Sequence, residues 1–316
     1  MKKTELAVGA VLFGALLFAA PSGFAQVENQ GQGQVIVTVL PKHDGGAAAN
    51  LSPQDAKLKV NGKELSVTNL VPLTGDRDSL ELVVLLDSGA RSSLGTQFGD
   101  IERFIKSLPP NTRVTIGYMQ NGAAALTGPL TEDHAAALRG LHLPGGTAGS
   151  DASPYFCLSD LAKRWPSEDP KARREVLMVT DGVDRYNLRY DPDDPYLQAA
   201  ISDAVRARLV VYTIYWRNQG RIENTRYENN AGQNLMLGVT QATGGKSFWE
   251  GLGNPVSFEP FLDELGRRLR NQYELSFVSP LKGKSEVQDM RLKFSVPGSE
   301  VNAPERVFVG RVPVQN

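Results

Sequence analysis

The sequence of 316 residues predicts an α/β fold in which a doubly wound, mostly parallel sheet is flanked by small β modules. Uncharged apolar runs recur between residues 82 and 216, as in strands buried on both faces of a sheet. The segments between them repeat apolar residues every three or four positions, as amphipathic helices do. The segments before and after this region instead alternate apolar and polar residues, which favours antiparallel strands.

The first 25 residues are expected to be a secretory signal peptide. Two lysines precede an uncharged apolar run from Leu6 to Ala20, and small residues stand at the −3 and −1 positions of the bond after Ala25. This run is shorter than the ~20 residues that a membrane-spanning helix needs. We therefore predict cleavage after Ala25, a secreted or periplasmic location, and no transmembrane anchor in the mature chain.

The balance of charged residues and the cysteine content limit the kinds of partner and of covalent cross-link. The 34 basic residues nearly balance the 35 acidic ones, for a net charge of −1, and no long basic run is present. Such neutrality argues against nucleic acid as the partner. The single cysteine, Cys157, excludes an intramolecular disulfide, so a hydrophobic core must hold the fold. We expect Cys157 to be a buried residue of a helix.

Residues 26–79 are expected to form an N-terminal β module with a linker. A polar, Gly-rich segment precedes the apolar run VIVTVL at residues 35–40. Further on, Asn61-Gly62 separates two alternating segments. This dipeptide tolerates the positive φ angles of a type I′ turn and predicts a β-hairpin.

Residues 80–271 carry the strand and helix pattern of the α/β domain. The expected strands lie at 82–86, 114–119, 176–180 and 209–216, with a short one at 245–249; the expected helices include 98–108, 197–205 and 258–269. Residues 272–316 return to alternation and are expected to add antiparallel strands, which can pack with the N-terminal module.

Three loops that follow strands resemble the von Willebrand factor A (VWA) domain. Residues 87–93 read Asp-Ser-Gly-Ala-Arg-Ser-Ser, residues 143–151 are Gly-rich, and Thr180-Asp181-Gly182 ends a later strand. The VWA family has Asp-x-Ser-x-Ser after its first strand, a Thr in a Gly-rich loop and commonly Thr-Asp-Gly later. The resemblance covers about residues 80–271 and implies a Rossmann-like VWA fold. With its β flanks, the chain is similar to secreted bacterial "VWFA-related" proteins known mainly from acidobacteria.

The resemblance implies a metal-ion-dependent adhesion site at Asp87, Ser88, Thr147 and Asp181. A hard divalent cation, Mg²⁺ or alternatively Mn²⁺ or Ca²⁺, binds oxygens of this kind. However, Gly89 and Arg91 stand where the family motif has serines. Two hypotheses stay open: a retained divalent cation, or a degenerate, metal-free site in which a guanidinium pairs directly with the Asp87 carboxylate.

The strand-end loops are also expected to form a partner-binding face, because ligands of open α/β sheets gather at the carboxyl ends of the strands. The remaining residues of this face are Arg91, Ser92, Ser93, Ser150, Asp184 and Asp191. The resemblance implies adhesion or assembly with a protein partner in the envelope or outside the cell. The alternative hypothesis is a structural scaffold subunit of an envelope complex, with a vestigial metal site and contacts made by the β flanks.

Catalysis is not expected. The sequence has no Gly-x-Ser-x-Gly turn for a serine nucleophile, and the loop at 145–149 lacks the lysine of a phosphate-binding loop. A hydrolase is therefore the least favoured hypothesis. The acidic stretch YDPDDPY at 190–196 lacks the spaced glycine and closing glutamate of a calcium loop, and its prolines favour a solvated loop.

Overall fold

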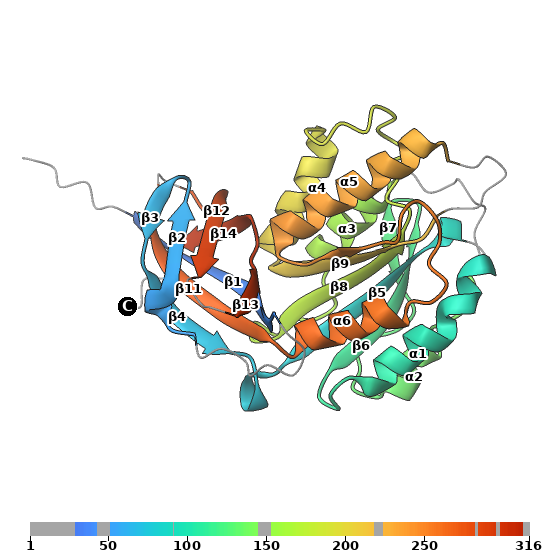
Figure 1. The fold of residues 1–316 in the computed structure, drawn as a ribbon, viewed down its shortest axis with the longest axis horizontal. Coiled ribbons are helices and arrows are strands. Elements are labelled where there is room, and N and C mark those ends of the chain that lie inside the picture. The colour runs from blue at the N-terminus through green and yellow to red at the C-terminus, as the bar shows by residue number, and fades with distance from the viewer. Residues whose placement is uncertain are drawn as a thin grey trace, which may run out of the picture.

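The computed structural model describes residues 29–42, 51–90, 92–144, 153–217, 224–281, 284–294 and 298–311. The predicted signal peptide and three residues of the expected site, Arg91, Thr147 and Ser150, lie outside these ranges. Within them the chain forms two sheets and six α-helices. Figure 1 shows the two sheets as separate layers, with the larger one on the left.

The central sheet has six strands in the order β10-β9-β8-β5-β6-β7. Its strands are β5 (Leu80–Asp87), β6 (Arg113–Gln120), β7 (Ala123–Leu126), β8 (Arg173–Thr180), β9 (Leu209–Tyr215) and β10 (Ser247–Phe248). All neighbours run parallel except β6 and β7, which are antiparallel. The chain first builds β5 in the middle and then adds strands on both sides, so the expected doubly wound order is present in this sheet.

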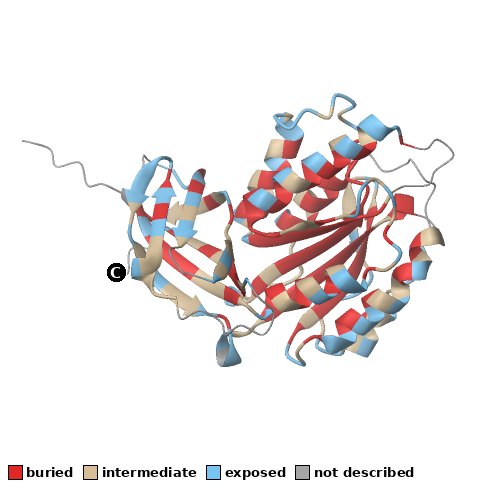
Figure 2. Cartoon of the chain, viewed as in Figure 1, coloured by how far each residue is buried: buried red, intermediate tan, exposed pale blue. Residues whose placement is uncertain are grey.

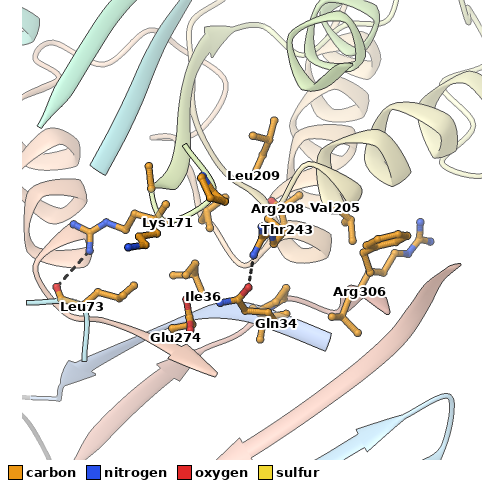
Figure 3. A pocket seen from close by; sticks show the side chains of 18 residues that line it. Gln34, Ile36, Leu73, Lys171, Val205, Arg208, Leu209, Thr243, Glu274 and Arg306 are labelled. Atoms are coloured by element: carbon orange, nitrogen blue, oxygen red, sulfur yellow. Dashed lines mark hydrogen bonds between the residues drawn. The ribbon is translucent and has the colours of Figure 1, made fainter. Parts of the chain in front are cut away.

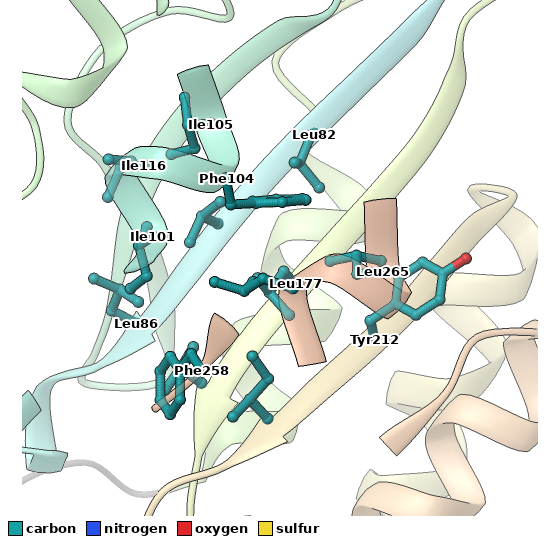
Figure 4. Close-up of a cluster of buried hydrophobic side chains, with 14 of the residues drawn as sticks. Leu82, Leu86, Ile101, Phe104, Ile105, Ile116, Leu177, Tyr212, Phe258 and Leu265 are labelled. Atoms are coloured by element: carbon teal, nitrogen blue, oxygen red, sulfur yellow. The ribbon is translucent and has the colours of Figure 1, made fainter. Parts of the chain in front are cut away.

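Helices cover both faces of the central sheet (Figure 1). They are α1 (Phe98–Ser107), α2 (His134–Leu138), α3 (Pro154–Lys163), α4 (Pro195–Arg206), α5 (Arg226–Thr243) and α6 (Glu259–Leu269). On one face, side chains of α1 and α6 such as Ile101, Phe104 and Leu265 pack on Leu82 and Leu86 of β5 (Figure 4). On the other face, α3, α4 and α5 pack on the alternate side chains of the same strands, and Cys157 is buried there.

The larger sheet has eight strands and is antiparallel. Its main order is β3-β2-β12-β14-β1-β11-β4, with β13 paired to β1. The strands are β1 (Asn29–Pro41), β2 (Ala56–Val60), β3 (Lys63–Leu65), β4 (Val67–Pro72), β11 (Gln272–Leu281), β12 (Glu286–Phe294), β13 (Ser299–Asn302) and β14 (Arg306–Arg311). Asn61 and Gly62 adopt the positive φ angles of 47° and 77° that the predicted hairpin between β2 and β3 requires.

This second sheet corrects the predicted fold class in part. A mostly parallel, doubly wound sheet describes only the central sheet. The two flanking segments pack together, as expected, but they form one sheet instead of two small modules, because β1 and β4 pair with β11 from the far end of the sequence. Alternating side chains explain the merger: Val35, Val37 and Leu275 are buried in one core that draws on both segments.

The two sheets meet at the amino ends of the parallel strands. A crevice of about 620 Å³, its mouth included, lies at this seam (Figure 3). Arg208 donates a hydrogen bond to Gln34 of β1 inside it, and Arg173 pairs with Asp78 at 2.6 Å beside it. The first contact joins the loop before β9 to the antiparallel sheet, and the second joins β8 to the connector between β4 and β5. The carboxyl ends of β5 and β8 consequently point away from the antiparallel sheet (Figure 1).

The two sheets differ in how far their residues are buried. The parallel strands are buried almost throughout, whereas the antiparallel sheet alternates buried and exposed residues (Figure 2). None of the helices in the described ranges is both long and apolar enough to cross a membrane.

Candidate functional site at the carboxyl ends of the strands

Asp87 and Asp181 lie at the carboxyl ends of two neighbouring parallel strands, β5 and β8. The Thr180 hydroxyl donates a hydrogen bond of 2.6 Å to Oδ2 of Asp87, and the backbone N–H of Gly89 donates one of 2.8 Å to Oδ1. The strand-end placement expected from the sequence is therefore observed. Thr180, the first residue of Thr-Asp-Gly, joins the two loops.

The residues after Asp87 turn inward. Ser88 is 3% exposed, and its hydroxyl donates a hydrogen bond of 2.6 Å to the carbonyl of Met119 at the end of β6. The Ser93 hydroxyl donates to the carbonyl of Ala90 at 3.2 Å, within two short 3-10 turns that span 88–90 and 92–97. The hydroxyl of Ser88 is thus used to hold the loop against β6.

Asp181 is buried and surrounded by donors. Its Oδ1 accepts a hydrogen bond of 2.9 Å from the backbone N–H of Val183. Its Oδ2 accepts one of 2.8 Å from the Asn224 amide and one of 3.1 Å from the Arg185 guanidinium. Burial raises the pKa of the Asp181 carboxyl, and the charge of Arg185 and the two amide donors oppose that rise.

The Asp181 loop is held by close backbone packing against α5. Gly182 has a φ of 68°, and a Cβ atom there would lie 2.5 Å from the carbonyl oxygen of Gly232 on α5. The Tyr155 hydroxyl of α3 donates a hydrogen bond of 2.8 Å to the Gly182 carbonyl. Only glycine combines this φ with so close an approach, which accounts for the Gly of Thr-Asp-Gly.

The acidic residues further along the loop have different surroundings. Asp184 is 2% exposed and accepts hydrogen bonds from the backbone N–H groups of Tyr186 and Asn187. Burial raises the pKa of Asp184, and these hydrogen bonds oppose the rise. Asp191 is exposed and caps the N–H of Asp193, and Asp194 is the N-cap of α4. Asp184 supports the loop from inside, so only Asp191 of this pair reaches the surface expected to bind a partner.

Of the four expected metal ligands the structure describes Asp87, Ser88 and Asp181, and each of them forms hydrogen bonds within the protein. A cation such as Mg²⁺ needs several oxygens that are directed at one point. Here both oxygens of Asp181 accept hydrogen bonds from the protein, and the Ser88 hydroxyl points at Met119. In the part of the chain that the structure describes, no three His, Cys, Asp or Glu side chains are placed to share a metal ion.

Exposed aromatic side chains surround the same loop. Tyr186, Tyr196 and the partly exposed Phe156 pack edge to face, with ring centroids 5.0 to 5.7 Å apart. Tyr190 packs on Tyr227 at 5.9 Å. The most exposed large apolar side chains here are Tyr186 (54%), Leu188 (72%), Tyr196 (52%) and Tyr227 (67%), which we call the tyrosine patch. Tyr186 and Leu188 lie in the loop that follows β8, and Tyr196 and Tyr227 lie in the first turns of α4 and α5.

Several residues of this site were not singled out from the sequence. They are Arg185 and Asn224, which donate hydrogen bonds to Asp181, and the exposed residues of the tyrosine patch. A guanidinium was expected at the site, but from Arg91, which lies outside the described residues. The sequence signal for the patch was the concentration of tyrosines at 186, 190 and 196 just after the Thr-Asp-Gly motif.

No protein-family model matches this sequence, and no curated protein sequence matches it. Solved structures do match. One is the conserved hypothetical protein BatB from Bacteroides thetaiotaomicron, with a TM-score of 0.44 and 15% identity over 60% of this chain and 97% of that one. Another is the SpRpn10 VWA domain, with a TM-score of 0.37 and 11% identity over 56% of this chain and 96% of that one.

The chain also resembles the pilus adhesin SpaC from Lactobacillus rhamnosus GG in its open conformation. The TM-score is 0.43 at 9% identity. The match covers 86% of this chain but only 50% of SpaC, so this chain spans about half the length of that adhesin.

Proposed function

We propose that this chain is an exported VWA-type protein that binds a protein partner through the loops at the carboxyl ends of its parallel strands. The observation that carries the proposal is the tyrosine patch beside the Asp181 loop. Exposed apolar groups gathered in one place mark interaction surfaces, and tyrosine is enriched at the centres of protein interfaces. Tyrosine supplies a large apolar ring and a hydroxyl that stays solvated when no partner is present.

The architecture supports this choice of face. The antiparallel sheet covers the amino ends of the parallel strands, while the carboxyl ends point away from it (Figure 1). The hydrogen bonds of Asp87 and Asp181 fix the loops from which the patch extends. A surface whose backbone is held in place before binding loses less entropy when the partner docks.

Photo-crosslinking in the native envelope tests the partner-binding face. A photoreactive amino acid replaces Leu188 in the patch, and a matched control replaces Val278, which is 38% exposed on β11 of the other sheet. We expect one discrete crosslinked protein from position 188, identified by mass spectrometry, and none from position 278. Capture of that protein should fall at least about tenfold when Tyr186 and Tyr196 are both changed to Ser, since two interface tyrosines contribute 1 kcal/mol or more each.

The opposite pattern would reject the proposal. If crosslinks form from position 278 and not from position 188, the antiparallel sheet makes the contacts. That result favours the alternative of a scaffold subunit in an envelope complex.

Export is tested separately. We expect the protein from the envelope or culture fluid to begin at Gln26, as read by intact mass, because small residues precede the bond after Ala25. Protein that retains residues 1–25 in the cytoplasm would contradict export.

A further inference from the structure

We propose that Arg185 supplies the positive charge at the strand-end site, so that the site is built to work without a divalent cation. The inference rests on the proposed VWA-type identity of the site, because that resemblance is what implies a cation there. It goes further by naming the group that takes over the charge of the cation. Its test needs no partner, so it can fail while partner binding stands.

The geometry is a closed set of three side chains. One nitrogen of Arg185, Nη2, donates to Oδ2 of Asp181 at 3.1 Å and to Oδ1 of Asn224 at 3.3 Å. The amide of Asn224 in turn donates to the same Oδ2 of Asp181 at 2.8 Å. Each member therefore contacts the other two. Asn224 orients the guanidinium and the carboxylate toward one another.

Burial favours an opposite charge beside the ionised Asp181 carboxylate. The Asp181 side chain is 3% exposed, and a buried carboxylate is costly unless an opposite charge and hydrogen bonds compensate it. Arg185 is 30% exposed, so its side chain stays in partial contact with solvent while its guanidinium pairs with the buried carboxylate.

The other oxygens of the site that lie in the described residues agree with this assignment. Oδ1 of Asp181 is held by the N–H of Val183, and Oδ2 of Asp87 by the hydroxyl of Thr180. Ser88 directs its hydroxyl to the carbonyl of Met119. Each of these groups forms a hydrogen bond within the protein. Gly89, at a serine position of the family motif, has no side-chain oxygen to offer. The positive charge of Arg185 and the hydrogen bonds of the loop together stabilise the buried carboxylate, which is the role that a bound cation would have.

Thermal unfolding of the mature chain tests the inference. Melting temperatures are compared in EDTA and in excess Mg²⁺, Mn²⁺ or Ca²⁺. We expect the same Tm in all four conditions for the wild type. R185M should lower Tm by roughly 5 to 10 °C, because the buried Asp181 carboxylate loses its charged partner. The double variant D181N/R185M should regain at least half of that loss, because it buries no unpaired charge.

The matched control is R189M, which removes an exposed arginine four residues along the same loop and should leave Tm unchanged. A rise in wild-type Tm with any of the cations, absent in D181N, would overturn the inference. So would a double variant that is no more stable than R185M. The wild-type titration decides the question even if R185M does not fold.

Discussion

The hydroxyl of Thr180 joins the last residue of β8 to Asp87 at the end of β5, over 2.6 Å. The same oxygen accepts a hydrogen bond of 3.1 Å from the N–H of Gly182. One buried side chain therefore fixes two loops of the proposed binding face, which come from distant parts of the sequence.

Removing this hydroxyl should loosen both loops. T180V leaves Oδ2 of Asp87 and the N–H of Gly182 without this partner, and we expect a loss of about 2 kcal/mol in the free energy of unfolding. T180S keeps the hydroxyl and should lose less than half as much. Urea denaturation of the three proteins measures the difference. Equal losses for T180V and T180S would mean that packing of the methyl group, and not the hydrogen bond, holds the loops.

Two glycines of α5 provide a matched pair. A Cβ atom on Gly232 would lie 2.2 Å from the carbonyl oxygen of Asp181, whereas one on Gly238 meets nothing within 4 Å. We expect G232A to cost at least about 2 kcal/mol because the Asp181 loop must move away. G238A should instead gain about 0.5 to 1 kcal/mol from helix propensity. Thermal melts measure the loss for G232A and the gain for G238A. An unchanged Tm for G232A would show that the loop does not depend on this contact.

The acidic stretch before α4 contains one structural aspartate. Asp194 accepts hydrogen bonds from the N–H groups of Tyr196 and Leu197 at the start of the helix. We expect D194A to cost about 1 kcal/mol, as for other N-caps. The exposed neighbour Asp193 is the control, and D193A should stay within about 0.5 kcal/mol of the wild type. Chemical denaturation measures both, and equal effects would remove the special role of Asp194.

Glu175 makes stability depend on pH. It is fully buried on β8, and burial raises its pKa from 4.5 to about 7, although the charge of Arg173 opposes the rise. Between these two values the unfolded chain releases the proton and the folded chain keeps it, so stability falls as pH rises from about 4.5 to about 7. The contribution is full below the lower value and lost above the higher one.

E175Q should remove the part of the pH dependence of stability that comes from Glu175. A shift of that size corresponds to about 3 kcal/mol as an upper estimate. We therefore expect the free energy of unfolding of the wild type, relative to that of E175Q, to fall from about pH 5 to about pH 7.5 in urea titrations. Parallel pH profiles for the two proteins would contradict the assignment to Glu175.

The sequence predicted the parts of the fold whose side chains reflect burial. β5, β6, β8 and β9 each contain one of the expected uncharged runs, and α1, α4 and α6 repeat apolar residues on one face. By contrast α5 was not singled out, because Asn229 and Gln233 are buried on it and weaken the apolar pattern. Its capping box, Thr225 with Glu228, was the available signal. The edge strand β7 consists mainly of alanine, which does not favour strands.

For the site, the sequence predicted where Asp87 and Asp181 lie but not which side chains contact them. Strand ends place Asp87 and Asp181 together whatever the details of the loops. The contact of Asp181 with Asn224 spans 43 positions and depends on how α5 docks, which no local pattern encodes. The pairing of Arg185 with Asp181 spans only four positions, but it forms in an irregular loop where the helical spacing rule does not apply.

The pairing of β1 with β14 has a mechanical consequence. Gly31 lies opposite Arg311, so the start of β1 and the end of β14 lie at the same end of an antiparallel pair. Tension that pulls these two ends apart would therefore load the hydrogen bonds between β1 and β14 one after another instead of all at once.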